Sequence, residues 1–209
     1  MFDRFLSTYR VDGRISGSRL RPPSSLGQIQ GFPEFMDQFG GCTFSDGLYR
    51  VHTAETSQTL YQLVVEEFPS YRERITCFSY DWLGRQFALD AARREGDEPL
   101  VLMLEADTGE ALEIPATFSG FHNTEIIEHS DSALATRLLD EWRQRNPDAK
   151  PLAYDECVGF KIPLFLGGAD TVDNLEVTNL QVYWSICAQL WRGTRTLPPG
   201  TTIREVGIE

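Results

Sequence analysis

The sequence predicts an α+β fold, in which a mixed, mostly antiparallel sheet is flanked by helices and a smaller C-terminal α/β subdomain packs on the sheet. Three observations predict this fold. Segments with helical and strand-like periodicity alternate irregularly, without the strand-helix-strand rhythm of a doubly wound parallel sheet. Residues 99–114 have the pattern of a β-hairpin, and residues 158–191 combine two short strand-like runs with a helical one.

The N-terminal part is predicted to be mainly helical. Residues 1–9 have the pattern of a short helix. A second helix is expected over residues 24–38, because two serines can cap its start and apolar residues recur at helical spacing. Pro33 interrupts this pattern, so we expect either a kink or two short helices. Two consecutive glycines then end the segment.

A strand and a long helix follow. Residues 47–52 alternate between apolar and polar side chains, which predicts a strand. Thr56 or Ser57 can cap the helix after it, and apolar residues in register carry this helix to Phe68, where a proline closes it.

Four strands are predicted in the middle of the chain. Residues 75–80 and 85–89 are joined by a turn, and residues 99–106 and 110–114 form the clearest hairpin, around an Asp-Thr-Gly turn. Both faces of 99–106 are apolar, which predicts a central strand.

Two helices are expected next, at 119–127 and 131–145. Two strands at 158–165 and 175–177 follow, then a helix at 179–191 and a closing strand within 198–208. Ser130 or Asp131 can cap the second of these helices. On the last helix, we expect Val182, Trp184 and Ile186 to belong to one core stripe.

Length and composition predict a globular protein. The chain of 209 residues, of which 41% are hydrophobic, can form one large domain or two small domains packed together. No apolar run approaches the roughly 18 residues that a membrane span needs. Charged residues interrupt the first 14 positions, which therefore lack the apolar core of a signal peptide. We expect a soluble cytoplasmic protein without a membrane partner.

The net charge of −12 is concentrated in the middle of the chain. Residues 51–160 hold nine basic and twenty-one acidic residues, whereas residues 1–50 and 161–209 have net charges of +1 and −1. Such a field repels nucleic-acid phosphates and attracts a basic partner. Acidic composition also serves solubility alone, and the sequence leaves that alternative open.

Cofactor motifs are missing from the sequence. Cys42, Cys77, Cys157 and Cys187 stand singly among apolar neighbours, which predicts reduced, buried thiols and no zinc site. The Gly167-Gly168 pair is not followed by the Gly-Lys-Ser/Thr of a phosphate-binding loop. We expect no cofactor.

The best enzymatic candidates are two histidines. His122 and His129 are seven residues apart, which places them on one helix face with Glu125 between them. A metal-dependent hydrolase could use such a trio, but the HExxH arrangement is absent. Surface or capping histidines are the preferred interpretation. In the Tyr80 to Arg85 segment, we expect aromatic packing in the core and local pairing of an aspartate with Arg85.

Three stretches of the chain carry a family resemblance. They are residues 40–52 (GGCTFSDGLYRVH), residues 78–90 (FSYDWLGRQFALD) with the hairpin at 102–115, and residues 158–190. In this order they resemble the type VI secretion immunity proteins of the Tdi class, which join a GAD-like N-terminal region to a Tdi C-terminal domain. The resemblance implies a GAD-like domain at 1–124 and a Tdi-type domain at 125–209.

The resemblance also implies a function. Such a protein binds and neutralises a cognate type VI DNase toxin, in a 1:1 complex and without catalysis of its own, and so protects the producing cell and its kin in antibacterial competition. Acidic residues and two tyrosines of the middle segment are the predicted toxin contacts: Glu66, Glu67, Tyr71, Tyr80, Asp97, Glu98, Glu105, Asp107 and Glu110. The alternatives are a hydrolase that uses His122, Glu125 and His129, and a GAD-like adaptor without a toxin partner.

Overall fold

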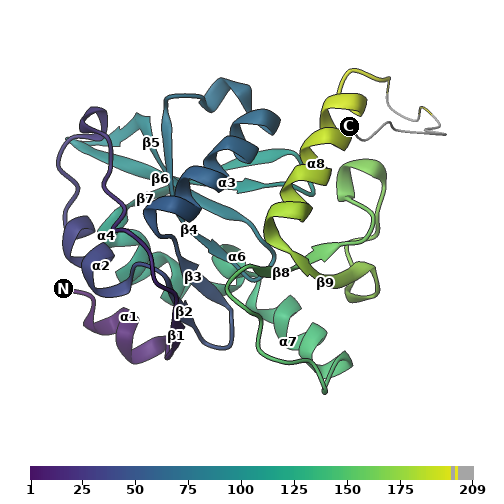
Figure 1. The fold of residues 1–209 in the computed structure, drawn as a ribbon, viewed down its shortest axis with the longest axis horizontal. Coiled ribbons are helices and arrows are strands. Elements are labelled where there is room, and N and C mark those ends of the chain that lie inside the picture. The colour runs from purple at the N-terminus through teal and green to yellow at the C-terminus, as the bar shows by residue number, and fades with distance from the viewer. Residues whose placement is uncertain (199–200, 202–209) are drawn as a thin grey trace.

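The computed structural model of the protein describes residues 1–198 and residue 201, and its centre is a seven-stranded sheet (Figure 1). The strands lie in chain order, and all neighbours are antiparallel. They are β1 (Val11–Arg14), β2 (Cys42–Phe44), β3 (Tyr49–Val51), β4 (Ile75–Asp81), β5 (Gln86–Glu95), β6 (Glu98–Glu105) and β7 (Glu110–Thr117). This arrangement confirms the predicted α+β class, with an antiparallel main sheet.

Helices and a second, two-stranded sheet surround the main sheet. The α-helices are α1 (Asp3–Thr8), α2 (Phe32–Phe39), α3 (Ala54–Glu67), α4 (Phe118–Gly120), α5 (Ile126–Glu128), α6 (Ser130–Leu134), α7 (Thr136–Arg145) and α8 (Leu180–Thr194). The 3₁₀ turns are η1 (Ser24–Leu26), η2 (Pro69–Tyr71), η4 (Leu164–Leu166) and η5 (Val172–Asn174), and η3 (Phe121–Glu125) is a π-helical turn. Strands β8 (Glu156–Phe160) and β9 (Leu175–Asn179) form the second sheet. Within the described residues, none of these helices combines the length and hydropathy that crossing a bilayer requires.

Helix α3 begins at a reciprocal cap. The Thr53 hydroxyl accepts a hydrogen bond from the Thr56 N–H at 3.3 Å, and the Thr56 hydroxyl accepts one from the Thr53 N–H at 3.0 Å. The predicted cap at Thr56 or Ser57 was therefore wrong by three or four residues, because the cap is Thr53 and Thr56 is the third helical residue of a capping box.

Two predicted helices are divided. The segment at 24–38 contains η1 and α2, and Pro33 lies in the first turn of α2, where a missing N–H costs nothing. The predicted helix at 131–145 is broken at Ala135, which has a φ of 48°. The last backbone carbonyls of α6 accept hydrogen bonds from side chains instead. The Leu134 carbonyl accepts from the Trp82 indole at 2.9 Å, and the Ala133 carbonyl accepts from the Arg85 guanidinium at 3.1 Å. These bonds satisfy the end of α6 and let the chain turn.

Strands β1 and β2 are absent from the sequence prediction. All four residues of β1 are exposed, and β2 has only three residues, so neither leaves an alternating pattern. The predicted strand at 158–165 ends at Phe160, shortly before η4 begins. The closing strand predicted within 198–208 falls on residues 199–200 and 202–208, which lie outside the described residues.

The main sheet separates two hydrophobic cores. Alternate residues of β6 face opposite sides, with Val101 and Met103 in one core and Leu102 and Leu104 in the other. The first core is rich in phenylalanine and lies under α1, α2 and the helical segment after β7. The second lies under α3 and α8. Both faces of β6 are thus covered, as the sequence predicts for a central strand.

The β8–β9 hairpin and α8 form a unit that packs beside the main sheet (Figure 1). The Val158 N–H donates to the Trp82 carbonyl at 2.7 Å, and the indole of Trp184 donates to the Gly84 carbonyl at 2.8 Å. The Asn179 side chain caps α8. Both cores contain residues from each side of position 124, and the division into 1–124 and 125–209 stays a prediction.

Candidate interaction surface

The predicted acidic contacts lie at opposite ends of one strand. Asp97 and Glu98 are at the β5–β6 turn, whereas Glu105, Asp107 and Glu110 are at the β6–β7 turn. The eight residues of β6 separate the two turns, a distance of about 26 Å at roughly 3.3 Å per residue. The acidic residues therefore form two groups, not one continuous patch.

The end of α3 belongs to the second group, but several side chains of this group are buried. Glu67 is 1% exposed and Asp107 is 5% exposed. Burial, together with a smaller contribution from the nearby Asp107 carboxyl, raises the pKa of Glu67 to about 9. Burial likewise raises the pKa of Asp107 to about 7. In this conformation neither carboxyl reaches the surface, and neither presents a full charge at neutral pH.

Glu105 belongs to a buried charge cluster. The Arg85 guanidinium donates to the Asp81 carboxylate at 2.7 Å and to the Glu105 carboxylate at 3.3 Å. Asp81 also accepts the N–H groups of Leu83 and Arg85 at 3.0 Å each. This confirms the predicted Asp81–Arg85 pair, which is reinforced by hydrogen bonds from backbone N–H groups within the turn. Glu105 is thereby held by a structural partner.

The tyrosine anchors occupy different environments. Tyr80 is fully buried, donates a hydrogen bond to the Tyr154 carbonyl and lies under the Arg50 guanidinium, which is 5.3 Å from its ring centre. Tyr71 is half-buried, with the Arg74 guanidinium 4.8 Å from its ring centre. Of the two, Tyr71 alone has surface available for a partner.

Four acidic residues of the prediction reach solvent. Glu66 is half-exposed and lies 3.9 Å from Arg192 of α8. Glu110 and Asp97 are exposed, and Glu98 is partly buried. An acidic contact with a partner is thus available at each end of β6, through two residues at each end.

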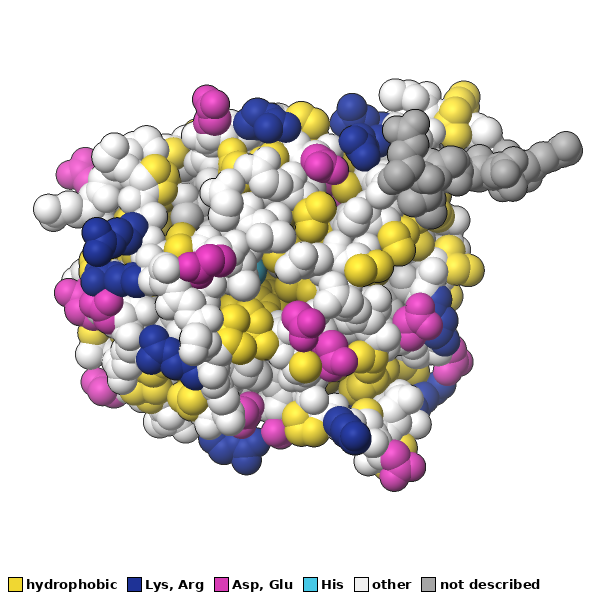
Figure 2. Space-filling model, in the orientation of Figure 1, with side chains coloured by type: hydrophobic (Ala, Val, Ile, Leu, Met, Phe, Trp, Pro, Cys, Tyr) yellow, Lys and Arg dark blue, Asp and Glu magenta, His cyan; other side chains and the backbone are white. Residues whose placement is uncertain are grey.

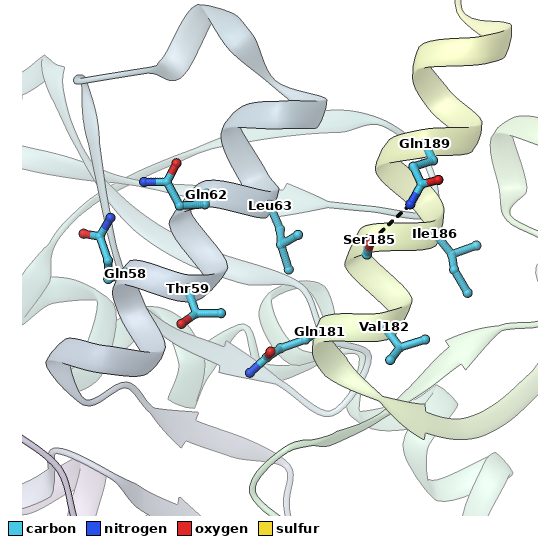
Figure 3. A pocket seen from close by; sticks show the side chains of 9 residues that line it. All are labelled: Gln58, Thr59, Gln62, Leu63, Gln181, Val182, Ser185, Ile186 and Gln189. Carbon is cyan, nitrogen blue, oxygen red and sulfur yellow. Dashed lines mark hydrogen bonds between the residues drawn. The ribbon is translucent and has the colours of Figure 1, made fainter. Parts of the chain in front are cut away.

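A groove lies between α3 and α8. It has a volume of about 740 Å³ and is lined by Gln58, Thr59, Gln62, Leu63, Gln181, Val182, Ser185, Ile186 and Gln189 (Figure 3). None of these described lining residues is charged. Figure 2 shows the same face, where polar uncharged and apolar side chains fill the strip between the two helices.

The groove corrects the sequence interpretation of α8. Trp184 faces the core and is fully buried, but Val182 and Ile186 are 51% and 38% exposed. The predicted single stripe is therefore two faces of one helix. The signal that separates them is the i, i+4 spacing of Val182 and Ile186, in register with Ser185 and two glutamines.

The metal trio that was considered as an alternative is not assembled, and the preferred interpretation of His122 as a surface or capping histidine was wrong. His122 is fully buried; its Nδ1–H donates to the Phe118 carbonyl and its Nε2 accepts from the Tyr49 hydroxyl, both at 2.9 Å. Its only lone pair is thus engaged, and burial lowers its pKa to about 3. Glu125 lies in the same π-helical turn as His122 but is partly exposed, and His129 is exposed. Among the described residues, no group of three His, Cys, Asp or Glu side chains is placed to hold a metal ion.

The third histidine of the chain and the four cysteines are core residues. His52 is fully buried between Thr56 and Gln86, with nitrogen-to-oxygen distances of 3.0 and 2.9 Å, and burial lowers its pKa to about 4. All four cysteines are free and buried, which confirms their predicted state. Burial raises the pKa of the Cys77 thiol to about 12, a value that keeps it protonated and unreactive.

Comparison with known proteins identifies the C-terminal part. Residues 135–191 match the family described as T6SS immunity protein Tdi1, C-terminal, and this segment contains α7, the β8–β9 hairpin and most of α8. No curated protein matches the chain significantly. The crystal structure of Atu4351 from Agrobacterium tumefaciens has a similar fold, with a TM-score of 0.54 and 11% sequence identity over 90% of this chain and 89% of that one.

These findings confirm the family recognition for the matched segment. Residues 135–191 are similar to the C-terminal domain of type VI secretion immunity proteins of the Tdi1 family. The likeness to Atu4351 shows a shared fold and extends over most of the chain. The GAD-like assignment of residues 1–124 stays a prediction.

Proposed function

We propose that this immunity protein binds a cognate DNase toxin of the type VI secretion system and blocks it, as a 1:1 complex in the cytoplasm. The match of residues 135–191 to the Tdi1 family carries the proposal. The producing cell and its kin would be protected by binding alone, with no reaction catalysed by this chain.

The charge of the chain supports a nuclease as the target. A DNase must bind phosphates, and it therefore presents a basic cleft. A partner with a net charge of −12 is steered toward such a cleft and associates with it quickly. Exposed carboxylates at the rim act mainly on the association rate, so apolar or aromatic anchors must supply most of the affinity.

The acidic contacts are proposed at four positions of the predicted set that contact solvent, of which Glu98 is partly buried. Glu66 and Glu110 would act at one end of β6, and Asp97 and Glu98 at the other. Reversing both charges of one pair should slow association and flatten its dependence on salt, because fewer screened attractions remain. The pair that produces no change lies outside the interface.

The test is a calorimetric titration of the purified protein against a catalytically inactive variant of the nuclease encoded beside its gene. We expect nanomolar 1:1 binding, and co-expression with the active nuclease should restore growth. Absence of both binding and protection would overturn the proposal and favour an adaptor without a toxin partner. A toxin-like gene next to this one would argue against the adaptor.

A further inference from the structure

We propose that the groove between α3 and α8 is the anchoring site of the complex, and that its occupant is an amphipathic helix of the toxin with an uncharged inner face and a basic outer face. This inference rests on the proposed function and names the part of the partner that this surface fits.

The geometry of the groove suits a helix. Each wall is one face of a helix: the α3 wall uses positions i, i+1, i+4 and i+5 from Gln58, and the α8 wall uses the same spacing from Gln181 and continues to Gln189. The Glu66–Arg192 pair joins the C-terminal ends of the two walls. Two helices side by side leave a furrow whose ridges can interlock with those of a third helix.

The chemistry of the walls selects an uncharged inner face. The described lining residues carry amides, hydroxyls and alkyl groups but no charge, in a chain where 24% of the residues are charged. A charged group that entered would lose its hydration without gaining a counter-charge. Amides and hydroxyls can still donate to and accept from neutral polar groups, as the 3.3 Å bond from Gln189 Nε2 to Ser185 Oγ shows (Figure 3).

Apolar side chains provide the anchor points. Val182 and Ile186 of α8 and the partly buried Leu63 of α3 line the groove. In Figure 3, Leu63 lies on the side of α3 toward α8, whereas Val182 and Ile186 project from adjacent turns on the outer side of α8. Such side chains, surrounded by neutral polar groups that exclude water on binding, are typical of an interface centre.

Charge complementarity favours the toxin, rather than a second copy of this chain, as the occupant of the groove. Two copies that each carry −12 repel one another. A helix with lysine and arginine on its outer face is attracted by the same field, while its uncharged face enters the groove. The α8 wall lies within the matched segment at 135–191, so the site belongs to the part of the chain that is recognised as an immunity domain.

The test compares single glutamate substitutions on exposed apolar residues. Val182→Glu and Ile186→Glu lie in the groove, whereas Val177→Glu on β9 and Leu112→Glu on β7 are controls with similar exposure. Each full-length variant is titrated against the inactive toxin, and its thermal unfolding is recorded. We expect the groove variants to lose about 100-fold in Kd, since each buries an unpaired charge, and we expect the controls to stay within threefold.

Hydrogen exchange of the wild-type chain gives a readout that needs no variant. Binding should slow exchange in residues 54–67 and 180–194. If the wild type binds but the groove variants bind equally well and protection appears elsewhere, the groove is refuted and the proposed function stands. If the wild type does not bind the toxin, both fail. A concentration-dependent dimer of the chain alone that Ile186→Glu dissolves would assign the groove to a second copy and overturn the toxin helix.

Discussion

Replacing Glu67 with methionine should stabilise the protein, and the gain should grow with pH. The carboxyl lies in the last turn of α3 and is 1% exposed, and neither of its oxygens has a hydrogen-bond partner among the described residues. Its surroundings belong to the second core, near Val64 and Cys187. Methionine has a similar volume and no polar group to desolvate.

The size of the expected stability gain follows from the pKa of Glu67. Burial raises the pKa of Glu67 from 4.5 to about 9, so the folded chain holds a proton that the unfolded chain releases. A raised pKa gives stability that is complete below the unfolded value and is lost as pH rises toward the folded value. At roughly 1.4 kcal/mol per pH unit, the loss between pH 4.5 and pH 7 is about 3 kcal/mol. Methionine should recover this amount.

The assay is urea unfolding of the wild type and Glu67→Met at pH 5, 7 and 8. We expect a gain of less than about 1 kcal/mol at pH 5 and of about 3 kcal/mol at pH 7. The latter corresponds to a Tm increase of roughly 6–12 °C for a chain of this size. Affinity for the toxin should not change, because the side chain is buried.

Glu66→Met is the matched control, because Glu66 is adjacent to Glu67 in the chain but half-exposed. This substitution should change the free energy of unfolding by no more than about 0.5 kcal/mol. The reasoning would be refuted if Glu67→Met were no more stable than the wild type at pH 8. Equal losses of stability from pH 5 to pH 8 in both proteins would also refute it, because the pH dependence would then belong to other groups such as Asp107.

Four further substitutions test the fold. Thr53→Ala should cost about 1 kcal/mol by removing the cap of α3, measured by urea unfolding; no loss would mean that the capping box is unimportant. His122→Ala should lower the free energy of unfolding by about 3 kcal/mol, and His129→Ala should leave it almost unchanged. Equal effects of the two substitutions, together with stoichiometric metal in the purified protein, would support the metal site. Trp184→Phe should cost about 2 kcal/mol, since it removes the bond to Gly84 and leaves a void; an unchanged Tm would show that α8 is held by other contacts.

The sequence was informative where a pattern is repeated over several turns or along a whole strand. The β6–β7 hairpin, α3 and α8 have such patterns, and all were predicted close to their observed bounds. It was less informative where tertiary contacts decide. The break at Ala135 depends on the Trp82 and Arg85 side chains, which come from a turn some 50 residues away in sequence. No local propensity records such a contact.

The candidate site was harder to predict than the fold, because charge in a sequence does not show where that charge lies. Glu67 and Asp107 are counted as acidic residues but are buried, and Glu105 is held by Arg85. The exposed row at Val182 and Ile186 was assigned to the core, since hydrophobic residues at helical spacing are usually buried. Assigning each position of α8 to a helix face would have placed Val182 and Ile186 on a different face from Trp184.

The burial of these acids changes how the net charge can act. Asp81 and Asp90 are fully buried against Arg85 and Arg74, and with Glu67 and Asp107 they add little to the field outside the molecule. The charge that a toxin meets is therefore spread over exposed side chains at the two ends of β6 and around the rest of the surface. Such scattered charges steer a partner but do not hold it. The uncharged strip between α3 and α8 can hold a partner, because there water can be excluded without stranding a charge.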